Sequence, residues 1–140
     1  MKQWIEKNTV TMSAVMIALF AVVAVLFSYH QNLWVDESTQ LSGLTLPVFE
    51  IYRWLGGLIE NPFPVPSDRM PMLSYLLGAA WSSVFGLDVL SMRWLSLVVV
   101  IAGLLLLGVY LAKKKQFIVL FSSLLFLCLS PNLIVIAVEI

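Results

Sequence analysis

The adjacent carboxylates Asp36 and Glu37 are the residues best placed to do chemistry in this chain of 140 residues. They follow a long apolar stretch directly, in the run Leu33-Trp34-Val35-Asp36-Glu37, and tryptophan is common where a membrane meets water. A carboxylate beside apolar residues is poorly hydrated, which makes it a stronger base. The pair therefore suits a general base or a cation ligand; the alternative is that both acids are solvated and help to orient the chain.

Two arginines are candidates for binding phosphate, because a guanidinium offers a planar fork of donors that matches phosphate oxygens. Arg69 follows Asp68 after a stretch with three prolines in five residues; the alternative is that the two charges neutralise each other at a helix start. Arg93 opens an apolar stretch, from which it could reach a lipid phosphate or simply extend its charge to the headgroups. His30 has no second ligand nearby in the sequence and indicates packing at an interface.

The composition places these residues on a membrane protein. The chain is 61% hydrophobic and 11% charged, against about 45–50% and about 25% in soluble domains, so its charges are too few to cover a globule in water. Eight basic and eight acidic residues leave no basic patch for nucleic acid. The single cysteine, Cys128, leaves no disulfide framework and no cysteine zinc site, and no glycine-rich phosphate loop, HExxH or GxSxG motif occurs.

Three stretches are long enough to cross a hydrocarbon core, which takes about 20 helical residues. They cover residues 8–29, 93–112 and 116–138. The first is longer than a signal-peptide core and has no small-x-small cleavage pattern before His30, which favours an uncleaved anchor over a cleaved signal peptide. The third is interrupted only near Pro131, and neighbouring helices can satisfy the backbone groups that a proline frees.

The charges set the expected topology. A fourth apolar stretch, Met70–Phe85, either crosses the membrane or lies in its outer interface. The positive-inside rule puts Lys2 and Lys7 in the cytoplasm and predicts the same side for Lys113–Lys115. Both conditions hold only if Met70–Phe85 does not cross. We therefore expect a multi-pass cell-membrane protein with a cytoplasmic N-terminus and an extracytoplasmic loop over residues 30–92.

That loop is long enough to carry structure of its own. Pro47 suits the first turn of a helix. In the residues after it, the apolar side chains fall on one face of that helix and the charged side chains on the other. The apolar residues at helical spacing are Val48, Ile51, Tyr52, Leu55, Leu58 and Ile59. This pattern predicts an amphipathic helix on the membrane surface, and Met70–Phe85 is expected to be a second interfacial helix. The predicted fold is therefore all-α, with three transmembrane helices and two juxtamembrane helices.

Six short motifs follow one another along the chain. They are Leu33-Trp34-Val35-Asp36-Glu37, Met70-Pro71-Met72-Leu73-Ser74-Tyr75, Trp81-Ser82-Ser83-Val84-Phe85-Gly86, Asp88, Met92-Arg93-Trp94-Leu95-Ser96, and Ser130-Pro131 with Glu139-Ile140. Their order resembles the N-terminal part of the GT-C membrane glycosyltransferases that use polyprenyl-phosphate sugars, such as protein mannosyltransferases and the aminoarabinose transferase of lipid A. The sequence departs from that family at its HPPLYY or KPPLYYW motif, where Asp68-Arg69-Met70-Pro71 stands instead.

The resemblance implies transfer of a sugar from a polyprenyl-phosphate-linked donor to an acceptor on the extracytoplasmic face, with inversion. Asp36 would be the general base, and Glu37 would support or orient it. Substrate-binding roles are implied for Asp68, Arg69, Arg93 and Glu139. No metal ligand is assigned, and a divalent cation is left open as a cofactor. The expected partners are the lipid-linked donor, membrane lipids and a protein, lipid or glycan acceptor, with no nucleic acid.

Members of that family have more spans, and the Arg and Tyr that follow the last motif are missing after Ile140. We therefore expect the N-terminal fragment of a larger polytopic enzyme, inactive alone. The alternative is a small non-catalytic three-span subunit or scaffold, which explains the length but not the order of the motifs. A transporter fragment is a third interpretation, although no predicted span carries a charge in its middle.

Overall fold

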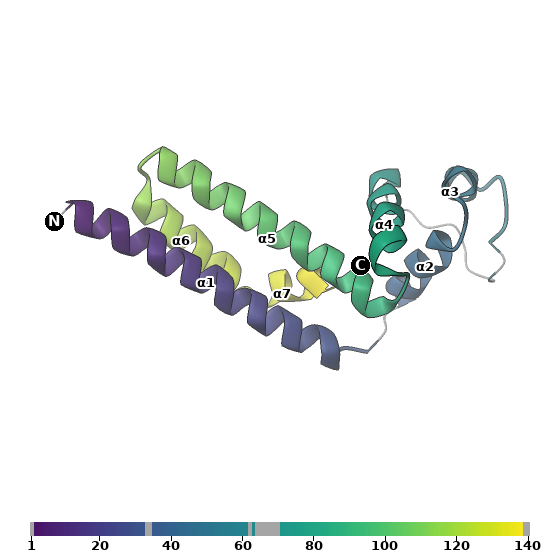
Figure 1. The fold of residues 1–140 in the computed structure, drawn as a ribbon, viewed down its shortest axis with the longest axis horizontal. Coiled ribbons are helices and arrows are strands. Elements are labelled where there is room, and N and C mark those ends of the chain that lie inside the picture. The colour runs from purple at the N-terminus through teal and green to yellow at the C-terminus, as the bar shows by residue number, and fades with distance from the viewer. Residues whose placement is uncertain (1, 33–34, 62, 64–70, 139–140) are drawn as a thin grey trace. The chain divides into compact units, whose positions relative to one another are not determined.

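The computed structural model describes residues 2–32, 35–61, 63 and 71–138, without the side chains of residues 2–7, 35–36, 131 and 136–138. The described residues form seven α-helices and no strand, as the all-α prediction requires (Figure 1). The helices are α1 (Lys2–His30), α2 (Val35–Leu44), α3 (Val48–Leu55), α4 (Met72–Phe85), α5 (Val89–Lys113), α6 (Phe117–Cys128) and α7 (Pro131–Val138). They divide into two compact units: unit 1, with residues 2–30 and 96–138, and unit 2, with residues 31–95.

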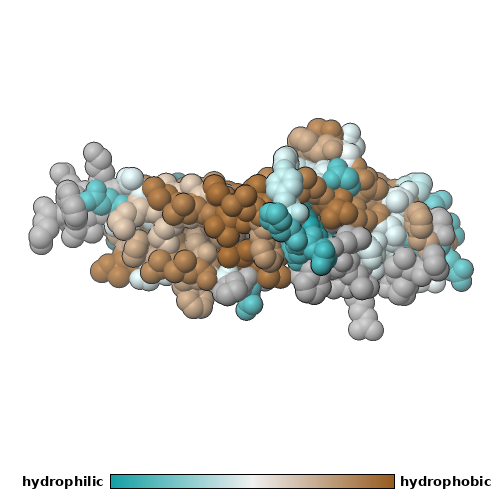
Figure 2. All heavy atoms as spheres, turned by 90° about the horizontal axis from the view of Figure 1, so that it is seen from below, coloured by the Kyte–Doolittle hydropathy of each residue, from teal (hydrophilic) through white to brown (hydrophobic). Residues whose placement is uncertain are grey.

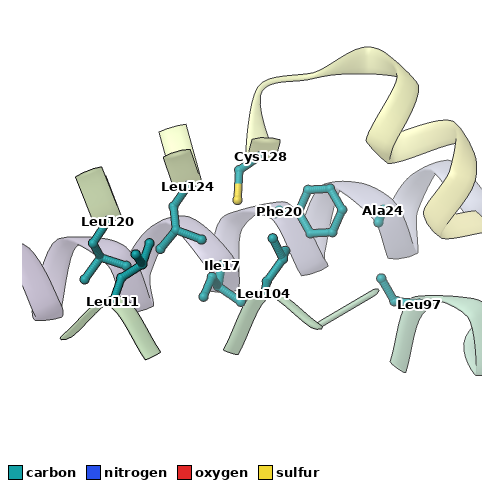
Figure 3. Packing of buried hydrophobic residues seen from close by; sticks show 9 residues of the cluster. All are labelled: Ile17, Phe20, Ala24, Leu97, Leu104, Leu111, Leu120, Leu124 and Cys128. Atoms are coloured by element: carbon teal, nitrogen blue, oxygen red, sulfur yellow. The ribbon is translucent and has the colours of Figure 1, made fainter. Parts of the chain in front are cut away.

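Unit 1 is held together by apolar seams on three helices. The buried positions of α1 are spaced four or three residues apart, those of α5 seven apart, and those of α6 four apart, so each set forms one stripe along its helix. The hydrophobic members are Ile17, Phe20 and Ala24 of α1, Leu97, Leu104 and Leu111 of α5, and Leu120, Leu124 and Cys128 of α6. Their side chains point toward one another in Figure 3.

By length and composition, two helices could cross a membrane: Asn8–His30, within α1, and Val89–Lys113, which is α5. Many outward residues of unit 1 are apolar, for example Leu19 at 61%, Leu106 at 71% and Phe126 at 77% exposure. Brown and tan atoms accordingly cover much of the face of these helices in Figure 2. A helix in water would carry a polar stripe there, so this surface suits a lipid environment.

The predicted span at residues 116–138 is interrupted, since α6 ends at Cys128 and α7 begins at Pro131. Proline has no N–H to donate and disfavours helical geometry in the residue before it, here Ser130. The backbone turns instead, with Ser130 N–H donating to Leu127 O at 3.1 Å and Leu133 N–H donating to Ser130 O at 3.1 Å. Neither helix alone has the length of about 20 residues that a span needs.

Unit 2 packs α2, α3, α4 and the first turns of α5 around an aromatic core. The Trp54 and Tyr75 rings meet edge to face, with centroids 5.8 Å apart and planes at 84°. At Gly43 of α2, an added Cβ would collide with Trp54 and lie 2.7 Å from Tyr75. The absence of a side chain at this glycine is therefore what lets α2 approach α3 and α4 so closely.

The helix predicted after Pro47 is present, but its length and its buried face differ from the prediction. It ends at Leu55, where Gly56 and Gly57 follow and Gly57 has a φ of 68°. Its buried side chains are Ile51 and Trp54, whereas Tyr52, expected on the apolar face, is 65% exposed. Packing against α4 selects the buried face, and the sequence alone does not contain that contact.

Candidate functional site

A buried ion pair joins α2 to α5 within unit 2. Arg93 Nε donates to Glu37 Oε1 and Arg93 Nη2 donates to Glu37 Oε2, both at 2.7 Å. The Arg93 and Glu37 side chains are only 4% and 1% exposed. Two parallel bonds between a planar guanidinium and a carboxylate are the strongest form of this interaction, and burial shields them from water and salt.

The same guanidinium also binds the chain that leads into α2. Arg93 Nη1 donates to the backbone oxygen of Gln31, and Nη2 donates to that of Asn32, both at 3.0 Å. One side chain therefore fixes residues 31–32 and the first turn of α2 with the same set of donors. This first turn carries Asp36, which occupies the helical position next to Glu37, about 100° around the axis.

The start of α5 places Arg93. Asp88 Oδ1 accepts the Ser91 N–H at 2.9 Å, which is the bond of an N-cap residue and starts the helix at Val89. Arg93 thus lies in the second helical turn, four residues after the helix begins, whereas the predicted span begins at Arg93 itself. Trp81 Nε1 of α4 donates to Ser91 O at 2.9 Å and to Ser91 Oγ at 3.2 Å, which ties α4 to this turn.

An open groove of about 530 Å³ runs along another side of α2. It is lined by Ser38, Leu41, Ser42, Thr45, Phe63, Leu87, Asp88 and Val89. Two of its hydroxyls donate to the backbone of α2, Ser42 Oγ to Thr39 O at 2.8 Å and Thr45 Oγ1 to Ser42 O at 2.7 Å. Although four of the eight lining residues are polar, the surface that they present to the groove is mainly apolar, which is the usual make-up of a small-molecule site.

The structure brings two of the six predicted site residues together, namely Glu37 and Arg93. Asp36 lies in α2, and its side chain is outside the described part. Asp68, Arg69 and Glu139 lie outside the described residues. Among the side chains that the structure describes, no group of three His, Cys, Asp or Glu could hold a metal ion.

Sequence reasoning did not pair Glu37 with Arg93, which are 56 residues apart. One signal pointed to a partner: an arginine at the start of an apolar stretch is costly to bury unless a carboxylate accompanies it. The buried side chains of Gln40, Asn61 and Ser91 were also not predicted as part of this region. Polar residues of this kind give no sign in a single sequence of whether they are buried.

Comparison with known proteins gives no relative from which the role of the Glu37–Arg93 pair could be inferred. No protein-family model, no curated protein and no solved structure matches the chain.

Proposed function

We propose that this chain belongs to a membrane glycosyltransferase that moves a sugar from a polyprenyl-phosphate-linked donor to an acceptor on the extracytoplasmic face. The observation that carries the proposal is the buried Glu37–Arg93 pair. It joins the acidic motif after the first predicted span to the arginine motif at the second. These are two of the motifs on which the resemblance to GT-C enzymes depends, and an ion pair gives them a physical reason to occur together.

The proposed reaction is an inverting displacement at the anomeric carbon of the sugar. The acceptor oxygen or nitrogen forms a bond to that carbon while the bond to the phosphate oxygen breaks, and the polyprenyl phosphate leaves with the electron pair. Asp36 takes the acceptor proton as general base. A phosphate monoester is a good leaving group, so no strong general acid is needed.

In this proposal Glu37 and Arg93 are positioning residues. The Arg93 guanidinium already donates to Glu37 and to two backbone oxygens, so a donor phosphate would have to displace those bonds. Arg93 therefore holds the first turn of α2, and with it Asp36, while the binding of the donor phosphate is assigned to Arg69. Asp68 and Glu139 keep their proposed substrate-binding roles.

The membrane arrangement is part of the same proposal. The N-terminus is cytoplasmic, α1 and α5 are spans, and α6 with α7 forms a third, interrupted span over residues 117–138. Helices α3 and α4 then lie at the outer interface. The arrangement has physical support in the lysines of residues 113–115, which the positive-inside rule places with the N-terminus.

The test is the Asp36→Asn variant of the full-length gene product in membranes, supplied with polyprenyl-phosphate hexose and pentose donors. Loss of a general base lowers the rate by about 10²–10⁴-fold, so we expect transfer to fall at least about 100-fold while membrane insertion is unchanged. The matched control is Glu60→Gln, which removes an exposed carboxylate of the same unit and should transfer normally. Near-normal transfer by Asp36→Asn, or no transfer by the wild type from any donor, contradicts the proposal.

A further inference from the structure

Unit 1 has an apolar groove between α1, α5 and α6. Its volume is about 160 Å³. It is lined by Val10, Ser13, Ala14 and Ile17 of α1, Leu105, Gly108, Val109 and Ala112 of α5, and Leu120 and Leu124 of α6. Small side chains create the space: a Cβ added at Gly108 would meet only Leu120 Cδ1, at the ordinary contact distance of 3.9 Å.

One polar atom on the groove wall has no partner. Ser13 Oγ is buried and forms no hydrogen bond with the part of the chain that the structure describes, and Ser13 as a whole is 5% exposed. A buried hydroxyl without a partner is unfavourable. Rotation of the Ser13 side chain about χ1 would turn this hydroxyl into the groove, where an occupant that brings an acceptor, such as an ester carbonyl, would satisfy it and a pure hydrocarbon would not.

The groove ends beside a cluster of positive charge. Ala112 lines the groove, and the exposed residues Lys113, Lys114 and Lys115 follow it directly. The sequence has no acidic residue between Asp88 and Glu139. Lysine clusters at the end of a membrane helix attract anionic lipids, and basic pockets between such helices bind lipid headgroups.

The backbone at Lys115 is in a conformation that favours glycine. Its φ is 56°, in the left-handed region. Lys115 N–H donates to Ala112 O at 2.9 Å and Gln116 N–H donates to Leu111 O at 3.1 Å, which is the pattern of a helix end that usually carries glycine. A lysine here is a strained choice, and such choices point to a use for the side chain.

We propose that this groove holds part of one acyl chain of an anionic phospholipid, whose phosphate lies against Lys113–Lys115 and whose ester carbonyl accepts from Ser13 Oγ. Charge complementarity and the unpartnered hydroxyl together favour a lipid over a plain hydrocarbon chain. The inference goes beyond the transferase proposal and shares with it only the location of α1 and α5 in a membrane.

The test fills the groove and leaves the charges intact. The purified chain in neutral detergent is mixed with phosphatidylglycerol or phosphatidylcholine, and the lipid retained is counted by native mass spectrometry. Gly108→Leu should abolish the preference for phosphatidylglycerol. Gly103→Leu is the matched control, because it makes the same change in the same helix at a position where an added Cβ meets nothing within 4 Å; its preference should equal that of the wild type.

The second arm changes the charges and leaves the groove open. Each lysine near an anionic headgroup raises affinity about fivefold, so replacing Lys113–Lys115 by glutamine should lower the preference at least tenfold, and replacement by arginine should keep it. Lys115→Gly should raise the melting temperature while weakening the preference. Glycerol 3-phosphate should not compete, because it offers the phosphate without the chain.

Four results would overturn the inference. They are an unchanged preference in Gly108→Leu, an unchanged preference in the glutamine variant, displacement of the lipid by glycerol 3-phosphate, and a wild-type dimer that Gly108→Leu dissociates. The last would assign the groove to a second copy of the chain. A transferase that fails its own test leaves all these readouts unaffected, so the two proposals fail separately.

Discussion

The two units are stabilised in opposite ways. In unit 1 the buried cluster consists of hydrophobic side chains, and many outward side chains are apolar as well. In unit 2 polar groups that are wholly or partly buried join different segments: Arg93 to Glu37, Trp81 to Ser91, and Asn61 to Ser42. Unit 1 is built around the long helices α1 and α5, packed through apolar seams, whereas unit 2 depends on a few specific bonds.

This difference shows where a single substitution has the most effect. Apolar packing is spread over many weak contacts, and in a lipid environment a helix loses little when one methyl group moves from the seam to lipid. A buried bidentate ion pair is concentrated in two residues, and removing either partner leaves an uncompensated charge. We therefore expect the units to respond very differently to matched changes.

The largest effect is expected from Arg93→Ala. It leaves the buried Glu37 carboxylate without its guanidinium, a change that costs about 3–5 kcal/mol. Hydrogen exchange in detergent micelles measures the free energy of local opening for each helix. Protection of α2 and α4 should fall to near that of an unfolded chain, while the amides of residues 8–28 in α1 keep theirs.

Two controls accompany that variant. Arg53→Ala removes an exposed arginine of unit 2 and should change protection by less than about 0.5 kcal/mol. The double variant Glu37→Met with Arg93→Met replaces the pair by apolar side chains of similar length, and such exchanges are often neutral; it should recover most of the protection. Equal loss of protection in α1 and α2 after Arg93→Ala would show that the two units do not open separately.

A smaller effect is expected from Gly43→Ala in unit 2, compared with Gly103→Ala in unit 1. The new methyl group at residue 43 collides with Trp54 and lies 2.7 Å from Tyr75 Cε1, and overpacking of this kind costs about 1–3 kcal/mol. At residue 103 the methyl group meets nothing within 4 Å, and alanine favours a helix over glycine by up to about 1 kcal/mol. Thermal melts of both variants test this: the melting temperature should fall for Gly43→Ala and rise for Gly103→Ala. Shifts of the same sign would contradict the prediction.

The long helices could be predicted from the sequence, because their apolar runs exceed the length of an ordinary core helix. The start of α3 after Pro47 could also be predicted, since proline fits a first helical turn. The sequence did not reveal α2, whose run VDESTQLSGL has too few apolar residues for a clear period. That helix forms where its small Gly43 allows contact with the rings of Trp54 and Tyr75.

The candidate site could be predicted as residues but not as contacts. Glu37 and Arg93 each stood out because charge beside apolar sequence is costly, yet nothing in a single sequence shows which distant charge compensates which. The buried face of α3 could not be predicted for the same reason, because Trp54 is buried by its neighbours in α2 and α4. Local periodicity specifies a helix, whereas long-range packing decides which of its sides is covered.

The smallest effect is expected when a buried serine in each unit is replaced by alanine. The same substitution should cost no stability in unit 1 and some stability in unit 2. Ser13→Ala in unit 1 removes a buried hydroxyl that has no partner among the described residues, so stability should stay the same or rise by up to about 1 kcal/mol. Ser42→Ala in unit 2 removes a hydroxyl that donates to Thr39 O and accepts from Asn61 Nδ2 at 3.4 Å. The Asn61 amide then lacks this acceptor in a buried site, which costs about 1 kcal/mol. Hydrogen exchange measures the stability change of each variant separately, in α1 for Ser13→Ala and in α2 for Ser42→Ala. If both helices lost the same stability, Ser13 would have a hydrogen-bond partner of its own, and unit 1 would also depend on specific polar bonds.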